Sequence, residues 1–325
     1  MRGGGGPRIR GRPGGPVRPR SRPEGIRWLR ADGSPNWSQR LRRKEGDAKT
    51  IASRPPITIS RSAPVMEAAE AIAERKVRGL IVADAKYRLE GIVLATDIVN
   101  YLGGGPFYNI VVGRHGGNIY SALRREPIQS IMNTSPVTVD VTVTIQDVVE
   151  VMVREGVGFL PVLYEDGSVY GVITERDVVR SLEPLPFDKK VEDYMTPTIV
   201  TVGVEATIKE ASRLMVAHGF RRLPVTDDKG EIKGVVTAKD IVSFFGSHEA
   251  FKFVKEGKME EALSTPVYYV MTPEFYTIHP KLSVADAAKR MIEKGVDSLI
   301  VTEGEEALGI ITERDVLIAA AVGEE

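Results

Sequence analysis

The sequence contains no cysteine, which excludes disulfide bonds, thiolate metal sites and cysteine nucleophiles. No apolar run approaches the roughly 18 residues that would predict a membrane-spanning helix. The four histidines lie in unrelated contexts without the spacing of metal ligands, and no arrangement of residues indicates a catalytic centre. We therefore expect that the protein is not an enzyme and does not span a membrane.

The charge of the chain is balanced overall but unevenly distributed. There are 44 basic and 44 acidic residues among 325, and 42% of the residues are apolar, which is enough for a substantial core. Residues 1–50 hold fourteen basic and four acidic residues, so residues 51–325 carry a balancing excess of ten negative charges. This pattern predicts a basic arm on an acidic body. Because no apolar stretch follows the first arginines, the arm is not a secretory signal, and we expect a cytoplasmic protein.

A short element recurs four times in the body. The sequence GVITERD at 171–177 is repeated as GIITERD at 309–315, as GVVTAKD at 234–240 and as GIVLATD at 91–97. Before each copy stand a lead-in segment, an amphipathic helix pattern and a short apolar strand pattern, and a second helix pattern follows it. The repeat therefore predicts a mixed α/β (α+β) fold of four β-α-β-β-α units, each too small to bury a core alone.

The distances between copies group the units into two tandem pairs, because long connectors follow only the first and third copies. We expect a disordered basic arm at 1–50, a first pair at 51–184 and a second pair at 185–325. The predicted boundaries are 51–104 for unit 1, 105–127 for its connector, 128–184 for unit 2, 190–246 for unit 3, 247–265 for its connector and 266–322 for unit 4.

The Thr-x-x-Asp part of the element, here called the corner, has two interpretations. Threonine followed three residues later by an acidic residue caps a helix, a contribution of about 1 kcal/mol. The same corner suits a nucleotide, because a helix N-terminus favours phosphate and a carboxylate at a strand end accepts hydrogen bonds from ribose hydroxyls. Basic residues directly before the aspartate could neutralise phosphate. Capping would account for any single copy, and the fourfold recurrence favours binding.

With these motifs the body resembles the cystathionine β-synthase (CBS) domain family, whose regulatory units act in pairs. The Met-Thr-Pro lead-ins, the Leu-Pro-Val strands and the repeated element carry the resemblance over about residues 53–320. It implies clefts that bind AMP, ADP or ATP as regulatory ligands, with no required cofactor and no metal, and adenine walls near 137–139, 199–201 and 276–278. The candidate nucleotide-binding residues are Thr174, Arg176, Asp177, Arg221, Arg222, Thr237, Lys239, Asp240, Thr312, Arg314 and Asp315.

The four copies are unequal. Leu94 replaces threonine in unit 1 and no basic residue precedes Asp97, so that site should be weak or empty. Asp297 of unit 4 should repel phosphate. Arg221 and Arg222 enter a buried strand, where they either meet an anion or lie solvated on a strand edge. We expect one or two good nucleotide sites, mainly in units 3 and 4.

The basic arm is rich in glycine, proline and arginine, a composition that cannot bury a core. Both tryptophans of the chain lie in it, and arginine with tryptophan suits RNA, since arginine pairs with phosphates and tryptophan stacks on bases. An inert tail, or a mis-assigned start, would also explain the composition. The candidate RNA-binding residues are Arg8, Arg10, Arg12, Arg18, Arg20, Arg22, Arg27, Trp28, Arg30, Trp37, Arg40, Arg42, Arg43 and Lys44.

Two functions follow from this organisation. Stand-alone four-unit proteins of this type in archaea also resemble ribosome-inactivating or hibernation factors, which implies a non-catalytic adenine-nucleotide sensor that binds the ribosome or rRNA through its arm and holds ribosomes inactive. The alternative is a cytosolic nucleotide-sensing subunit that regulates a metabolic enzyme or transporter in trans. Pairing of units between chains would give a homo-oligomer. We find no helix-turn-helix pattern that would favour a DNA-binding regulator.

Overall fold

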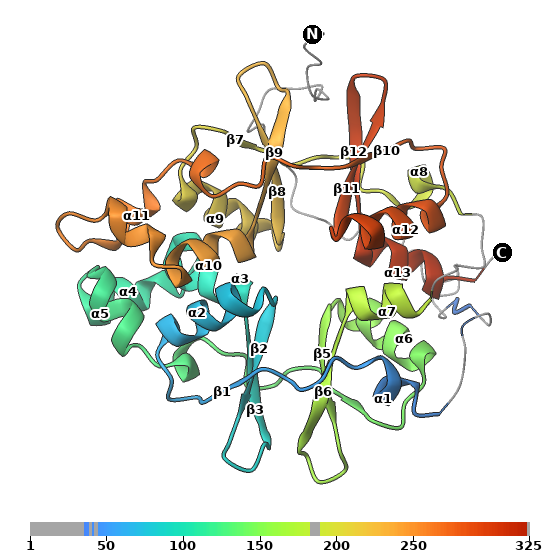
Figure 1. Cartoon of the computed structure of the whole chain (residues 1–325), viewed down its shortest axis with the longest axis horizontal. Helices are drawn as coiled ribbons and strands as arrows, with labels where there is room; N and C mark the ends of the chain where they lie inside the picture. Colours follow the sequence, from blue (N-terminus) through green and yellow to red (C-terminus); the bar gives the residue numbers. More distant parts are fainter. Residues whose placement is uncertain (1–35, 39–40, 42–44, 183–188, 324–325) are drawn as a thin grey trace.

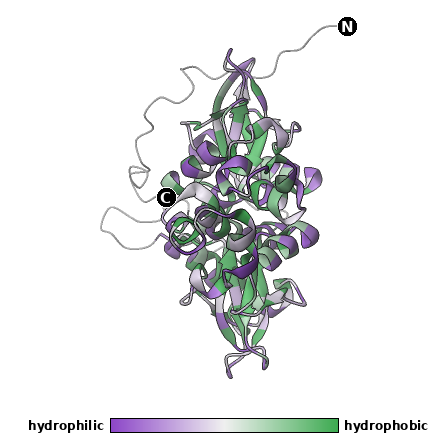
Figure 2. Cartoon of the chain, turned by 90° about the vertical axis from the view of Figure 1, so that its left-hand side faces the viewer, coloured by the Kyte–Doolittle hydropathy of each residue, from purple (hydrophilic) through white to green (hydrophobic). Residues whose placement is uncertain are grey.

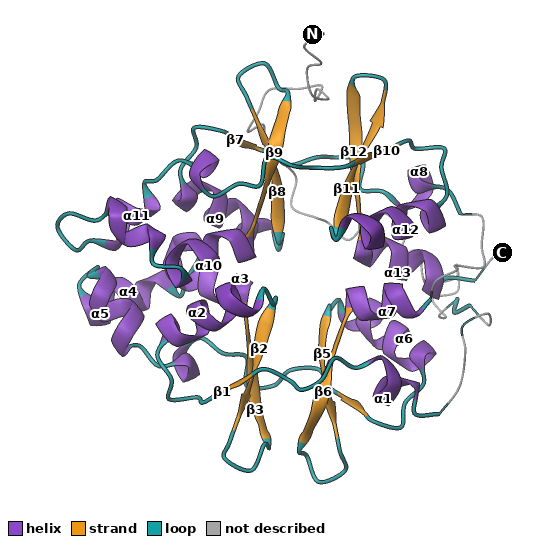
Figure 3. Cartoon of the chain, viewed as in Figure 1, coloured by secondary structure: helices purple, strands orange, loops and turns teal. Residues whose placement is uncertain are grey.

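The computed structural model describes residues 36–38, 41, 45–182 and 189–323. Four small sheets surround a common centre, and the helices lie between and outside them (Figures 1 and 3). Turned by 90°, the molecule is a thinner disc whose strands are mainly hydrophobic (Figure 2). No helix within the described ranges is long and apolar enough to cross a membrane.

Each unit contains one three-stranded sheet, in which a short first strand runs parallel to the second and the third completes an antiparallel hairpin. The predicted mixed α/β fold of four repeated units is confirmed. The strands are β1 (Thr58–Ile59), β2 (Gly79–Ala83) and β3 (Leu89–Leu94) in unit 1, β4 (Val139–Asp140), β5 (Phe159–Leu163) and β6 (Val169–Thr174) in unit 2, β7 (Val202–Gly203), β8 (Arg222–Thr226) and β9 (Ile232–Thr237) in unit 3, and β10 (Thr277–Ile278), β11 (Ser298–Glu303) and β12 (Glu306–Thr312) in unit 4.

Two helices accompany each sheet, one after the first strand and one after the third. These are α2 (Val65–Arg75) and α3 (Ala95–Val99) in unit 1, α6 (Ile145–Glu155) and α7 (Glu175–Ser181) in unit 2, α9 (Ile208–His218) and α10 (Ala238–Gly246) in unit 3, and α12 (Val284–Lys294) and α13 (Glu313–Ala321) in unit 4. The first helix of units 2, 3 and 4 begins at a capping box, in which Thr144, Thr207 or Ser283 accepts from a backbone N–H of the first turn. These caps fix where the helices begin.

Shorter helices lie in the N-terminal segment and the connectors. They are α1 (Asp47–Ile51), α4 (Tyr108–His115), α5 (Ile119–Arg125), α8 (Val191–Tyr194), α11 (Met259–Leu263), a π-helical turn at Asn100–Gly104, and 3₁₀ turns at Ile128–Ser130, Glu249–Phe253 and Val267–Tyr269.

The core is built by contacts both within and between the pairs. One apolar cluster joins the helices of units 1 and 3, and a second joins those of units 2 and 4. Two smaller clusters join the sheets of units 1 and 2 and of units 3 and 4. Each unit therefore packs sheet to sheet on its pair partner and helix to helix on a unit of the other pair, which leaves all four units facing one centre.

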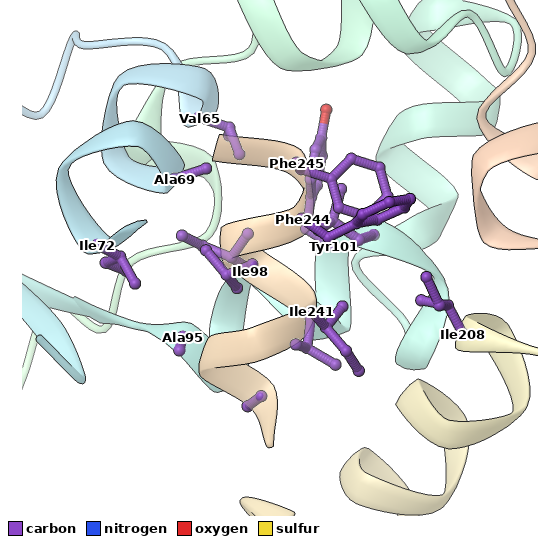
Figure 4. Packing of buried hydrophobic residues seen from close by; sticks show 14 of the residues in the cluster. Val65, Ala69, Ile72, Ala95, Ile98, Tyr101, Ile208, Ile241, Phe244 and Phe245 are labelled. Carbon is purple, nitrogen blue, oxygen red and sulfur yellow. The ribbon is translucent and has the colours of Figure 1, made fainter. Parts of the chain in front are cut away.

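The helix contact between units 1 and 3 is the crossing of α2 and α10. Ile241, Phe244 and Phe245 of α10 are directed into the cluster beside Ile98 (Figure 4). Gly246 ends α10, and a Cβ atom placed there would lie 2.2 Å from the carbonyl oxygen of Ala69 in α2. The two backbones thus approach as closely as a glycine allows.

The lead-in of each unit crosses to the last strand of its pair partner. Antiparallel bridges connect Ser53 with Val172, Asn133 with Ile92, Thr196 with Ile310 and Thr272 with Val235. The first glycine of the repeated element lies beneath each crossing: a Cβ atom at Gly234 would lie 2.4 Å from the carbonyl oxygen of Thr272. The repeated glycine is therefore explained by a backbone that passes directly over it.

The described body begins before the predicted boundary at residue 50. Trp37 forms an antiparallel bridge with Val322, Ser38 N donates to Ala321 O at 2.7 Å, and Leu41 is buried. Trp37 and Leu41 pack on the apolar cluster of units 2 and 4, and the backbone of Ser38 is bonded to the last residue of α13. Trp37 therefore lies on the body, and its role in RNA binding stays a prediction; the other candidate RNA-binding residues lie outside the described residues.

Candidate functional site

The corners of units 2, 3 and 4 share one geometry. In each, one carboxylate oxygen of the aspartate accepts from the backbone N–H and the hydroxyl of the threonine, at 2.8 and 2.6 Å for Thr174 and Asp177 and at 2.8 and 2.7 Å for Thr237 and Asp240. In unit 4 the two bonds from Thr312 are both 2.8 Å. The helix-capping interpretation is confirmed, and it uses only Oδ2 of each aspartate.

The other oxygen remains for a second role. Oδ1 of Asp177 accepts from the hydroxyl of Ser53, at 3.1 Å, in the lead-in of unit 1. Asp240 lines the central cavity, and no described residue donates a hydrogen bond to its Oδ1. Capping and ligand binding are therefore compatible at one corner.

Unit 1 departs from this geometry as its sequence indicates. Leu94 supplies a backbone N–H to Asp97, at 2.7 Å, but no hydroxyl. Burial raises the pKa of Asp97 to about 6, and only the one backbone hydrogen bond opposes it. Burial also raises the pKa of Asp240, but there the hydroxyl and N–H of Thr237 and the charge of Lys239 oppose the shift.

One cavity of about 510 Å³ lies at the centre and is lined by residues of all four units. It reaches the threonine and aspartate of two corners, Thr174 with Asp177 and Thr237 with Asp240, and also Leu94 to Thr96 of the unit 1 corner. Thr312, Asp315 and Asp97 do not line it, and Asp315 is buried. The best-placed corners thus belong to units 2 and 3, one from each pair.

The walls facing these corners come from the pair partner. Ser53, Pro55, Pro56 and Ile57 of unit 1 line the cavity beside Asp177, and residues Thr272 and Glu274 to Tyr276 of unit 4 line it beside Asp240. The predicted walls at 137–139 and 199–201 do not line the cavity, whereas Tyr276 does. Because the lead-ins cross to the pair partner, these two segments follow the lead-ins that cross units 1 and 4, and their assignment as adenine walls stays a prediction.

Five arginines and three carboxylates meet at the wall of the cavity and form the central network, which comprises Arg78, Arg176, Arg221, Arg222, Arg314, Glu175, Asp297 and Glu313. Arg78 pairs with all three carboxylates. Five cations against three anions leave an excess of two positive charges, and four of the five arginines line the cavity. The centre is therefore suited to anionic ligands.

The network is reciprocal between units 2 and 4. Arg176 Nε donates to Glu313 at 2.8 Å and Arg314 Nε donates to Glu175 at 2.8 Å. Each arginine also donates to a backbone carbonyl of the other unit, Arg176 to Gly295 and Arg314 to Gly156. The two predicted phosphate ligands thus already hold the two pairs together.

The paired arginines of unit 3 also find partners within the chain. Arg221 pairs with Glu175, and Nη2 of Arg222 lies 2.6 Å from Oδ2 of Asp297. The Arg222 side chain is only 8% exposed, so the alternative of a solvated strand edge was wrong for it. Its Nε has no hydrogen-bond partner among the described residues. Asp297, expected to repel phosphate, is engaged by Arg222 and Arg78 and does not stand as an isolated charge.

Two of the buried carboxylates, Glu175 and Asp297, are ionised at neutral pH. Burial alone would raise the pKa of Glu175, but the guanidiniums of Arg221, Arg314 and Arg78 outweigh it and lower this pKa to about 2. Burial likewise opposes ionisation of Asp297, and Arg222 and Arg78 lower its pKa to about 2. Glu175 and Asp297 therefore carry full negative charges within the network.

Sequence analysis did not identify Glu175, Glu313 or Arg78 as site residues. One feature of the sequence could have indicated the two glutamates. The residue after the threonine or leucine of the corner alternates along the chain: it is alanine in units 1 and 3 and glutamate in units 2 and 4. Arg78 and Arg221 occupy equivalent strand entries in units 1 and 3. Acidic and basic residues thus alternate around the centre. No group of three His, Asp or Glu side chains in the described part of the chain is placed to hold a metal ion.

Comparisons with known proteins agree with this architecture. The CBS domain family matches residues 48–104, 128–184, 191–247 and 267–322. An "uncharacterized 33.4 kDa protein in ribosomal RNA operon" of Thermofilum pendens is 31% identical over 264 residues, which cover 81% of this chain and 87% of that protein. Protein MJ1225 of Methanocaldococcus jannaschii is 30% identical over 264 residues, 80% of this chain and 94% of that protein.

The solved structures extend the match to three dimensions. The crystal structure of MJ1225, described as a proposed archaeal homolog of γ-AMPK, superimposes with a TM-score of 0.77 at 29% identity and covers 83% of this chain and 98% of that one. An uncharacterized conserved protein of Pyrococcus horikoshii shares the fold, with a TM-score of 0.53 at 20% identity and coverage of 84% and 98%. The chain belongs to the CBS-domain family and carries four CBS domains.

Proposed function

We propose that this protein is a non-catalytic sensor that binds AMP, ADP or ATP at the corners of Asp177 and Asp240 and regulates a partner. One observation carries the proposal: two corners with a carboxylate oxygen outside the helix cap open onto one cavity with an excess of positive charge. The description of the relative MJ1225 as a proposed homolog of γ-AMPK supports a regulatory role.

At each corner, the ribose, the base and the phosphates of the nucleotide contact different residues. Oδ1 of Asp177 or Asp240 accepts from the ribose hydroxyls, and the lead-in of the pair partner lies along the base. The phosphates point toward the guanidiniums of Arg78 and Arg221, both of which line the cavity. Ser53, which now donates to Asp177, yields its place to a ribose hydroxyl.

Changing Asp177 or Asp240 to asparagine is expected to weaken nucleotide binding at its own corner about tenfold to a hundredfold. Asparagine keeps one oxygen for the cap but loses the charge-assisted bonds to ribose. Calorimetry with AMP and ATP measures the change, and the double variant should lose both sites. Asp315→Asn is the matched control, because Asp315 forms the same corner with Thr312 and neither residue lines the cavity. Equal losses in the control, or full binding by the double variant, would refute the assignment.

We further propose that the partner is the ribosome or its RNA, reached through the basic N-terminal residues, and that the protein holds ribosomes inactive. The excess of ten positive charges in residues 1–50 favours a polyanionic partner. The Thermofilum pendens relative, whose name places it in a ribosomal RNA operon, adds support. A metabolic enzyme or transporter regulated in trans remains the competing proposal, and co-purification of such a protein would favour it.

Removing residues 1–35 is expected to abolish sedimentation with ribosomes. This truncation keeps Trp37, Ser38 and Leu41, which pack on the body, so the fold should survive. Sucrose gradients at low and high salt measure the association, and the full chain should dissociate as salt rises because phosphate contacts release counterions. If the full chain stays at the top of the gradient at low salt, the ribosome proposal is rejected while the nucleotide proposal stands.

A further inference from the structure

We propose that Glu175 is a specificity-determining residue that limits how much phosphate charge the central cavity accepts and so favours a nucleoside monophosphate over a triphosphate. The inference rests on the proposed nucleotide function and assigns the ligand class of the same sites. Glu175 acts through arginines, without touching the ligand, and is therefore a positioning residue.

Glu175 connects all four units at one point. It begins α7 in unit 2, its side chain is 0% exposed, and it pairs with Arg78 of unit 1, Arg221 of unit 3 and Arg314 of unit 4. No other carboxylate of the central network contacts three units besides its own. A change in its charge therefore reaches every side of the cavity.

The space for this carboxylate is provided by a glycine. A Cβ atom at Gly158 would lie 2.6 to 2.8 Å from the Glu175 carboxyl group. The equivalent position is Arg78 in unit 1, Arg221 in unit 3 and Asp297 in unit 4. Unit 2 thus contributes only Glu175 and Arg176 to the central network, and the Glu175 carboxylate reaches the arginines from the side away from the cavity.

Arginines of the central network line the cavity, and Glu175 and Glu313 pair with them from the side away from the cavity. Arg78 and Arg221 line the cavity, whereas Glu175 and Glu313 do not. A ligand phosphate therefore meets guanidiniums that are already paired, and the network's surplus is two positive charges. One phosphate monoester, with a charge of about −1.5 to −2 at pH 7, matches that surplus, and a second one at the other corner already exceeds it. A triphosphate brings more negative charge than the surplus compensates.

Removing the negative charge of Glu175 should weaken the preference for a monophosphate over a triphosphate. Glu175→Gln keeps the shape and the hydrogen-bond acceptor but raises the surplus by one positive charge. We expect the ratio of ATP to AMP affinity to rise about tenfold, because each additional phosphate charge gains attraction in a partly buried site. Glu313→Gln, which lies behind Arg78 and Arg176, should shift the ratio in the same direction.

The experiment is calorimetry of the full chain with AMP and with ATP at two salt concentrations. Glu175→Asp, which keeps the charge, should restore most of the wild-type ratio. Glu249→Gln, on the exposed turn at Glu249–Phe253, is the control that should leave the ratio unchanged. A thermal melt identifies any variant that does not fold; Glu313→Gln then provides the measurement. A structural role alone would move Glu175→Gln and Glu175→Asp together and leave the ATP to AMP ratio in place.

The outcomes separate the two proposals. If the wild type binds nucleotide and both glutamine variants shift the ratio toward ATP, the inference holds. If the wild type binds but the ratio stays the same in the variants, the inference is overturned and the sensor function stands. If the wild type binds neither nucleotide, both proposals fall.

Discussion

Replacing Gly246 with alanine is expected to lower the free energy of unfolding by about 3 kcal/mol or more. The added Cβ would lie 2.2 Å from the Ala69 carbonyl oxygen and 2.5 Å from its carbon, both backbone atoms that cannot rotate away. Helices α2 and α10 would have to separate, which opens the apolar cluster that joins units 1 and 3. Thermal denaturation should show a melting temperature lower by roughly 6 °C or more.

Gly113→Ala provides the matched control for this prediction. Gly113 lies inside α4, is exposed, and has no atom within 4 Å of the position of an added Cβ. Alanine should stabilise that helix by up to about 1 kcal/mol, so the two substitutions of the same type are expected to have opposite signs. Melting temperatures that change equally in both variants would contradict the close approach of α2 and α10.

Replacing Gly234 with alanine is expected to be nearly as damaging and also to weaken one nucleotide cleft. A Cβ atom there would lie 2.4 Å from the Thr272 carbonyl oxygen and 3.1 Å from the Pro273 Cα, so the lead-in of unit 4 must move away. The stability should fall by about 3 kcal/mol. Because this lead-in faces Asp240, binding at that corner should weaken while binding at Asp177 persists, as calorimetric stoichiometry would report.

Gly203→Ala is the control for Gly234. Gly203 also lies in a strand of unit 3, but no atom stands within 4 Å of its added Cβ. We expect little change in melting temperature or in nucleotide stoichiometry. If Gly234→Ala changes the melting temperature and the stoichiometry as little as this control does, the crossing backbone is not the reason for glycine at this position.

Much of the fold could be predicted because its signals are local and repeated. The threonine and aspartate of the corner must stand three residues apart to cap a helix, and the glycine, strand and corner always follow in the same order. Four copies of such a pattern identify the units even where one copy is altered, as at Leu94. The order of strands and helices within a unit then follows from periodicity alone.

The site was less predictable because it depends on which units face one another. Nothing near Glu175 in the sequence indicates that Arg78, Arg221 and Arg314 will surround it, since those contacts span 97, 46 and 139 residues. They exist because α2 packs on α10 and α13 packs beside α6 and α7. The position of Trp37 was unpredictable for a related reason: its sequence neighbours are basic, but it forms a bridge with Val322, far away in the sequence.

The crossing of the lead-ins also determines the order in which the bridges between units can form during synthesis. Ser53 can meet Val172 only after about 120 further residues have been made, which takes roughly 6 to 24 s at 5–20 residues per second. Asn133, by contrast, leaves the ribosome when Ile92 is already complete. The second pair repeats this asymmetry, because Thr196 waits for Ile310, which is made 114 residues later. In each pair, the lead-in of the first unit therefore gains its bridge only after the third strand of the second unit has been made.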